Sequence, residues 1–94
     1  MTALEVCVPE ETMEKQLEHI GCEFDELTKA LAIYRNEPTA KNRAEVLFEA
    51  LDLMTCTKSF IVMEFTEDET SAGVDNINSK NYVRHYRLDQ QGDE

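Results

Sequence analysis

Apolar residues recur through the first third of the chain at alternating steps of four and three residues. This spacing places them along one side of an α-helix and predicts a helix over residues 9–34. Pro9 suits the first helical position, because it has no amide hydrogen that needs a partner there. Pro38 disfavours helical backbone in the residue before it and ends the segment. The apolar positions are Met13, Leu17, Ile20, Phe24, Leu27, Leu31 and Tyr34.

A second segment, residues 39–65, is apolar over much of its circumference and is predicted to be one long helix. Such a helix is expected to be central in a bundle. Its sequence "AEVLFEALDLMTC" is nevertheless interrupted by Glu45, Glu49 and Asp52. An unpaired carboxylate is costly to remove from water. Either this edge of the helix is exposed, or something positive lies against the acids.

A third, more polar helix is predicted over residues 67–87, because Thr66 and Glu69 have capping-box spacing. The tail, residues 88–94, is expected to be disordered. The fold class is therefore all-α: a single domain over residues 1–94, with its core at about 10–87. We expect a small antiparallel bundle of three or more helices. Because a chain of 94 residues buries only a modest core, we expect oligomerisation to complete the bundle.

The charge of the chain narrows the choice of partners. Its 20 acidic and 9 basic side chains give a formal net charge of −11, which disfavours binding to nucleic acid polymers and to anionic membranes. An anionic substrate would need a mediating cation, although solubility alone can explain an acidic surface. No apolar run approaches the roughly 18 residues needed to span a bilayer. Three cysteines without CxxC spacing and no signal-peptide pattern favour reduced thiols and a cytoplasmic location.

Two pairs of acids have the spacing of metal ligands. Glu23 and Glu26, and then Glu49 and Asp52, are each three residues apart, so both carboxylates of a pair project from one side of a helix. Two helices joined by a short connection pack antiparallel, which would bring the pairs face to face. Converging carboxylates suit Mg²⁺, with Mn²⁺ as an alternative. Either pair alone is more often a solvated helix surface.

The order of these acids resembles the ExxE…ExxD signature of the MazG-like all-α nucleoside triphosphate pyrophosphohydrolases. The segment "CEFDELTKAL" is similar to the family's EExGELxxAL, and "INSKNYVRHY" is similar to its KNxxRxY. The resemblance covers roughly residues 10–87. It implies Mg²⁺-dependent cleavage of the α–β linkage of a (d)NTP, by metal-assisted attack of water, to a nucleoside monophosphate and pyrophosphate. It also implies a homodimer or homotetramer of helices.

The same resemblance implies which residues act. The metal ligands and catalytic acids would be Glu23, Glu26, Glu49 and Asp52, one of which would orient or deprotonate the attacking water. The triphosphate contacts would be Lys80, Asn81 and Arg84, with Tyr86 packing at the site. Asp25 stands where the family usually has Gly, and the chain has no Trp, so base preference stays open.

Two alternatives remain beside this interpretation. The substrate could be phosphoribosyl-ATP, or the chain could be a catalytically silent helical assembly module with solvated acids. For four further residues, a structural or surface role is favoured over a role at the site. Glu45 is a solvated or pairing acid, His19 a surface histidine, Cys56 a packing thiol, and Lys58 a side chain that snorkels along apolar surface.

Overall fold

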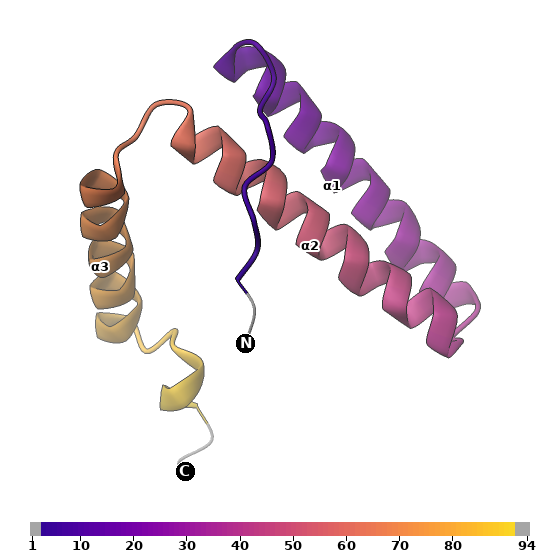
Figure 1. Ribbon diagram of the computed structural model, residues 1–94. Coiled ribbons are helices and arrows are strands. Elements are labelled where there is room, and N and C mark those ends of the chain that lie inside the picture. The colour runs from indigo at the N-terminus through magenta and orange to yellow at the C-terminus, as the bar shows by residue number, and fades with distance from the viewer. Residues whose placement is uncertain (1–2, 92–94) are drawn as a thin grey trace. The chain divides into compact units, whose positions relative to one another are not determined.

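The computed structural model describes residues 3–91. This part contains three α-helices and one short 3₁₀ helix and no strand, which confirms the all-α prediction. The chain divides into two compact units, residues 1–64 and residues 65–94. The elements, labelled in Figure 1, are α1 (Met13–Asn36), α2 (Ala40–Val62), α3 (Glu67–Val83) and η1 (Leu88–Gln90).

Helix α1 begins later than its sequence pattern predicted. Its N-cap is Thr12, whose hydroxyl accepts a hydrogen bond from the Lys15 amide at 3.1 Å. The prediction of a helix start at Pro9 was wrong, because a threonine hydroxyl can satisfy a free amide of the first turn. Residues 3–10, including Pro9, adopt no helical structure. The apolar spacing was correct, and the helix continues to Asn36.

Helix α2 follows after a short connection and runs antiparallel beside α1 (Figure 1). Its N-cap is Thr39, which accepts a hydrogen bond from the Asn42 amide at 3.1 Å. The Asn42 side chain also donates to the Glu37 carbonyl at 2.9 Å, which fixes the turn between the helices. The helix ends at Val62, before the predicted end at residue 65. The predicted antiparallel pairing is therefore present, and it sets which turns of the two helices face each other.

The α1–α2 hairpin leaves much of its apolar surface uncovered. Leu17, Phe24 and Leu31 lie seven residues apart in α1 and are 57%, 57% and 40% exposed. Leu47 and Met54, also seven residues apart, are 56% and 58% exposed on α2. The expected central position of α2 is thus not met within this unit. Among residues 3–91, the buried side chains are Gln16, Cys56 and Ser59.

Two buried polar side chains hold the N-terminal segment against the hairpin. Gln16 is 2% exposed; its oxygen accepts from the Glu10 amide at 2.8 Å, and its nitrogen donates to the Cys56 carbonyl at 3.0 Å. Ser59, also 2% exposed, accepts from the Cys7 amide at 3.2 Å and donates to the Cys7 carbonyl at 3.1 Å. A buried polar group is costly unless it is bonded, so these bonds explain how Gln16 and Ser59 are tolerated.

Lys58 anchors the same segment further toward the N-terminus. Its ammonium donates to the Leu4 carbonyl at 2.8 Å. The expectation that Lys58 merely snorkels was therefore incomplete, since its charged end has a specific backbone partner. The sequence gives no local signal for this bond, because Lys58 and Leu4 lie 54 positions apart.

Helix α3 has the predicted start but an earlier end. Thr66 and Glu69 form the expected capping box, with reciprocal bonds of 2.9 and 3.1 Å. The helix ends at Val83 instead of residue 87, because His85 has a left-handed backbone with φ of 57°. Leu88–Gln90, expected to be disordered, forms η1 instead. Residues 92–94 of the predicted tail lie outside the described residues.

No helix of the described chain combines the length and the apolar character that crossing a membrane requires.

Candidate metal centre

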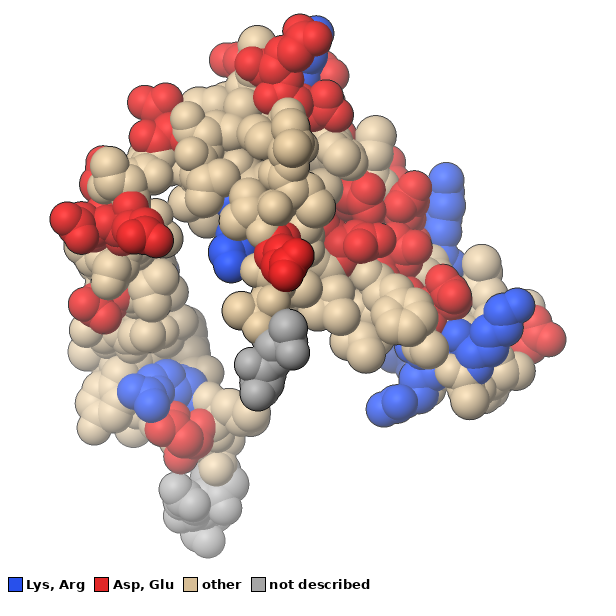
Figure 2. Space-filling view, in the orientation of Figure 1, with Lys and Arg blue, Asp and Glu red and all other residues tan. Residues whose placement is uncertain are grey.

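Four acids occupy facing turns of the α1–α2 hairpin. Glu23 and Glu26 lie on α1, and Glu49 and Asp52 lie on α2. One carboxylate oxygen each from Glu23, Glu49 and Asp52 lies within 4.8 Å of the other two. The i, i+3 spacing on each helix and the antiparallel pairing together produce this convergence. Figure 2 shows acidic side chains gathered over the middle of the hairpin.

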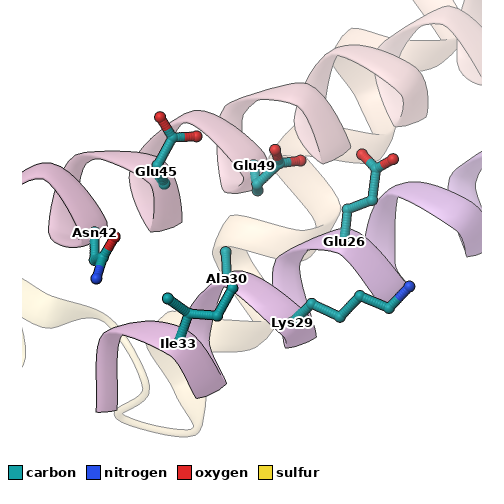
Figure 3. A pocket seen from close by; sticks show the side chains of 7 residues that line it. All are labelled: Glu26, Lys29, Ala30, Ile33, Asn42, Glu45 and Glu49. Carbon is teal, nitrogen blue, oxygen red and sulfur yellow. The ribbon is translucent and has the colours of Figure 1, made fainter. Parts of the chain in front are cut away.

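Glu26 joins this group as its fourth acid. Figure 3 shows the Glu26 and Glu49 carboxylates pointing into the same space from α1 and α2. The pKa of Glu49 is raised above its usual 4.5 by burial, then by the charge and hydrogen-bonding contact of Glu26 and the charges of Asp52 and Glu23. The acids therefore repel one another, and the site holds excess negative charge.

The pKa of Glu23 is raised in the same way as that of Glu49, but one contact acts against the increase. Burial raises the pKa of Glu23, and the charges of Glu26 and Asp52 raise it further. A hydrogen bond from His19 acts in the opposite direction. Desolvation and like charges both disfavour the ionised form, so the cluster is unfavourable without a positive partner.

Within the described chain the cluster has no lysine or arginine paired with it. Among residues 3–91, no Lys or Arg forms a salt bridge with any of the four acids. The Oε2 atoms of Glu23 and Glu49 are buried and accept no hydrogen bond there. Buried carboxylate oxygens without donors are rare in folded proteins. Their oxygen chemistry fits a hard divalent cation such as Mg²⁺, and these four residues would hold it.

Two hollows of similar size flank the acids. The first has a volume of about 250 Å³, and the second has a volume of about 240 Å³. Lining the first are Glu26, Lys29, Ala30, Ile33, Asn42, Glu45 and Glu49 (Figure 3). Lining the second are Cys7, Val8, Gln16, His19, Glu23, Asp52, Thr55, Cys56 and Ser59. Each hollow is thus lined by two of the four acids.

Lys29 was missed by the sequence interpretation. It lines the first hollow together with Glu26 and Glu49, and Figure 3 shows its ammonium directed away from Glu49. Lys29 follows Glu26 by three residues, and this spacing could have identified it as a neighbour. Glu45 lines the same hollow but is exposed, as expected for a solvated acid.

His19 is a partly exposed histidine, as expected, and it also contacts two carboxylates. Its Nε2 atom is 3.3 Å from Glu23 Oε1, and its Nδ1 atom is 3.5 Å from Glu10 Oε1. The ring is held between two carboxylates while its side chain remains 41% exposed. His19 therefore positions the Glu23 carboxylate, and its place four residues earlier in α1 was the signal for this role.

Cys56 lies beside the same acids on α2. It is 9% exposed, in agreement with its interpretation as a packing thiol. Burial raises the pKa of the Cys56 thiol, and the charges of Glu23 and Asp52 raise it further. Without a neighbouring cation, the thiol is therefore protonated at neutral pH and is a poor nucleophile.

The four residues expected to contact substrate lie in the second unit. Lys80 and Asn81 are near the end of α3, and Arg84 is its C-cap. The Tyr86 amide donates to the Asn81 carbonyl at 2.8 Å, within the turn that follows the helix. These contacts are local to that unit, and the roles of the four side chains stay predictions.

The chain was compared with protein-family models, with curated proteins and with solved structures, and none of the three comparisons yields a match.

Proposed function

We propose that the protein is a Mg²⁺-dependent nucleotide pyrophosphohydrolase. It would convert a (d)NTP and water to a nucleoside monophosphate and pyrophosphate. The observation that carries this proposal is the convergence of Glu23, Glu49 and Asp52, with Glu26 against them and two buried carboxylate oxygens lacking donors. The resemblance of three sequence segments to the MazG-like enzymes supplies the reaction class.

In this proposal the side chains of the protein bind the cation and orient its ligands. The four carboxylates hold the cation, and His19 fixes the Glu23 carboxylate through its contact at 3.3 Å. Bound Mg²⁺ would neutralise the charge of the phosphate chain and favour attack by water. The adjoining hollow of about 250 Å³ provides space on the Lys29 side for part of the substrate.

Phosphate recognition needs positive side chains, because the chain as a whole is strongly acidic. Lys29 lines the hollow beside Glu26 and Glu49 and would contact a phosphate oxygen there. Lys80, Asn81 and Arg84 remain the proposed contacts from the segment that resembles KNxxRxY, with Tyr86 packing beside them. A fixed positive charge near the leaving pyrophosphate stabilises the charge that develops on it.

The active form is proposed to be a homodimer or homotetramer. The exposed apolar positions of the hairpin recur every seven residues, a spacing that places them along one stripe of each helix. Such stripes are typical of helices that pack against further helices. A second copy of this chain supplies helices of matching length and pattern.

One assay tests the proposed reaction directly. The purified protein is incubated with a panel of (d)NTPs and with phosphoribosyl-ATP, in Mg²⁺ or in EDTA, and pyrophosphate release is measured. Release from a nucleoside triphosphate in Mg²⁺ alone is the expected result. Release from phosphoribosyl-ATP only would change the substrate while keeping the site and the reaction.

The competing proposal is a catalytically silent helical assembly module. The exposed apolar stripes favour assembly equally well under this reading. It differs in having no metal requirement, so it predicts no pyrophosphate release from any substrate and no binding of Mg²⁺. Isothermal titration with Mg²⁺ separates the two, because a silent module would give no heat of binding.

A further inference from the structure

Three different kinds of metal-binding atom converge beside the acidic cluster. His19 offers an imidazole nitrogen, Glu23 a carboxylate oxygen and Cys56 a sulfur, and one such atom from each lies within 4.8 Å of the other two. His19 and Glu23 are one turn apart on α1, and Cys56 comes from α2. We propose that this trio binds a divalent first-row transition-metal cation of the Zn²⁺ class. This proposal does not depend on the proposed hydrolysis.

The trio shares Glu23 with the proposed Mg²⁺ site and differs from it in its other two donors, a nitrogen and a sulfur. Mg²⁺ takes oxygen ligands, whereas thiolate and imidazole are preferred by Zn²⁺ and its neighbours. Three protein ligands with a fourth position left to water is a common arrangement for zinc sites that are open to small molecules. His19, Glu23 and Cys56 provide one nitrogen, one oxygen and one sulfur for such a shell.

The spacing of the three atoms suits a small metal ion. Zinc bond lengths near 2 Å place the ligands of a tetrahedral shell about 3.5 Å apart. His19 Nε2 and Glu23 Oε1 lie 3.3 Å apart, which is close to the separation of two ligands in such a shell. The remaining separations are at most 4.8 Å, so modest side-chain rotations would close the shell.

A carboxylate behind the histidine supports the same assignment. The other ring nitrogen of His19, Nδ1, faces Glu10 Oε1 at 3.5 Å. Metal-binding histidines commonly donate their second N–H to a carboxylate, which fixes the tautomer and directs the free nitrogen at the metal. Glu10 occupies this place, and Nε2 is the nitrogen directed toward Glu23.

The surroundings favour a cation and leave room for its fourth ligand. His19, Glu23 and Cys56 line one side of the hollow of about 240 Å³, which also includes Asp52. Glu23 and Asp52 place negative charge beside the buried Cys56 sulfur. A bound cation would offset this charge, and the thiol proton released on binding would pass to solvent.

Cobalt is the probe for this site, because a Co²⁺–thiolate bond absorbs in the near ultraviolet. The full chain is reduced with a non-thiol reductant and titrated with Co²⁺ in excess Mg²⁺. We expect a saturable thiolate-to-cobalt band that disappears when Zn²⁺ is added. Cys56→Ser and His19→Ala should each lose the band, while circular dichroism shows that their helices remain.

Matched controls separate this site from the exposed thiol of α1 and from an acid that the two proposed sites do not share. Cys22→Ser removes an exposed thiol of α1 and should retain the band. Glu49→Gln removes an acid of the proposed Mg²⁺ site and should also retain it. Absence of the band in the wild-type chain, or its survival in Cys56→Ser, would overturn the proposal whatever the outcome of the hydrolysis assay.

Discussion

The Ser59 hydroxyl pairs with both backbone groups of Cys7, accepting from its amide at 3.2 Å and donating to its carbonyl at 3.1 Å. This contact joins positions 52 residues apart and holds the extended N-terminal segment against α2. The hollow lined by Cys7 and Val8 of that segment also includes Glu23 and Asp52. The pairing therefore helps to form one wall beside the candidate metal centre.

Replacing Ser59 with Ala should release this segment. The loss of both bonds should lower the free energy of unfolding by about 2 kcal/mol. Hydrogen exchange at the Cys7 amide should become faster, while exchange in the centre of α1 stays unchanged. Ser71→Ala, at an exposed position of α3, is the control. Unchanged protection of the Cys7 amide in Ser59→Ala would show that the bond does not hold the segment.

Glu49→Gln tests the proposed metal centre by removing one charge at nearly constant shape. Mutation of a residue that only hydrogen-bonds to a metal ligand typically reduces metal affinity or activity by about 10- to 100-fold. Loss of a proposed ligand itself should therefore reduce Mg²⁺-dependent pyrophosphate release by more than about 100-fold. Glu45→Gln, on the same helix and at the same hollow, should remain close to wild type. Equal activity of wild type and Glu49→Gln would contradict the site assignment.

Raised acid pKa values make stability depend on pH in a defined direction. Burial and like charges raise the pKa of Glu23 and Glu49 above the 4.5 of an unperturbed carboxyl. Between 4.5 and these higher values, the folded chain holds more protons than the unfolded chain, so the free energy of unfolding decreases as pH rises. This stabilising contribution is fully present below 4.5 and is lost above the raised values.

Urea unfolding in EDTA from about pH 4 to about pH 7 measures this decrease. Glu49→Gln should show a smaller decrease than wild type, because its amide does not titrate. Glu18→Gln removes one exposed charge of α1 and should keep the wild-type slope. Mg²⁺ should restore stability near neutral pH in the wild type and much less in Glu49→Gln. Identical slopes in all three proteins would show that Glu49 is not the source of the effect.

The sequence predicted the acidic convergence because it depends on two local features. The i, i+3 spacing fixes which side of each helix carries the carboxylates, and the short connection after α1 requires antiparallel neighbours. The start of α1 could not be predicted in this way. The N-terminal segment lies against α2 because Ser59 and Lys58 bond to backbone groups 52 and 54 positions away, and because Gln16 bonds both to Glu10 and to Cys56 of α2.

The end of α3 was missed for a different reason. The segment that resembles KNxxRxY was read as continuous helix, but the backbone turns at His85, where φ is 57°. Non-glycine residues at positive φ are uncommon, and histidine is among those that adopt it more often. Nothing in the local apolar pattern marks this position, because apolar side chains such as Tyr82, Val83 and Tyr86 occur on both sides of His85.

Phe24→Glu tests the proposed self-association. Phe24 is 57% exposed and lies in the middle of the apolar stripe formed with Leu17 and Leu31. A buried charge without a partner would oppose packing of a second copy on this stripe, so the variant should sediment as a monomer. Cys22→Glu adds the same charge about 200° around the helix and should leave the assembly intact. Sedimentation velocity measures both, and a wild-type chain that is already monomeric would contradict the proposal.

Glu10→Ala tests the orientation of His19 without removing any proposed ligand. The Glu10 carboxylate faces Nδ1 of His19 at 3.5 Å, and its side chain is 48% exposed, so truncation should cost little stability. The Glu10 amide, which donates to Gln16, is retained. Loss of such a carboxylate typically weakens metal affinity by about 10- to 100-fold, and the weakening here should lie at the lower end because the contact is partly solvated. Competition between Zn²⁺ and a chromophoric chelator measures this change. Glu14→Ala removes an acid from the first turn of α1 and should bind Zn²⁺ as the wild type does, because only Glu10 and Glu23 form ion-pair contacts with His19 among the described residues.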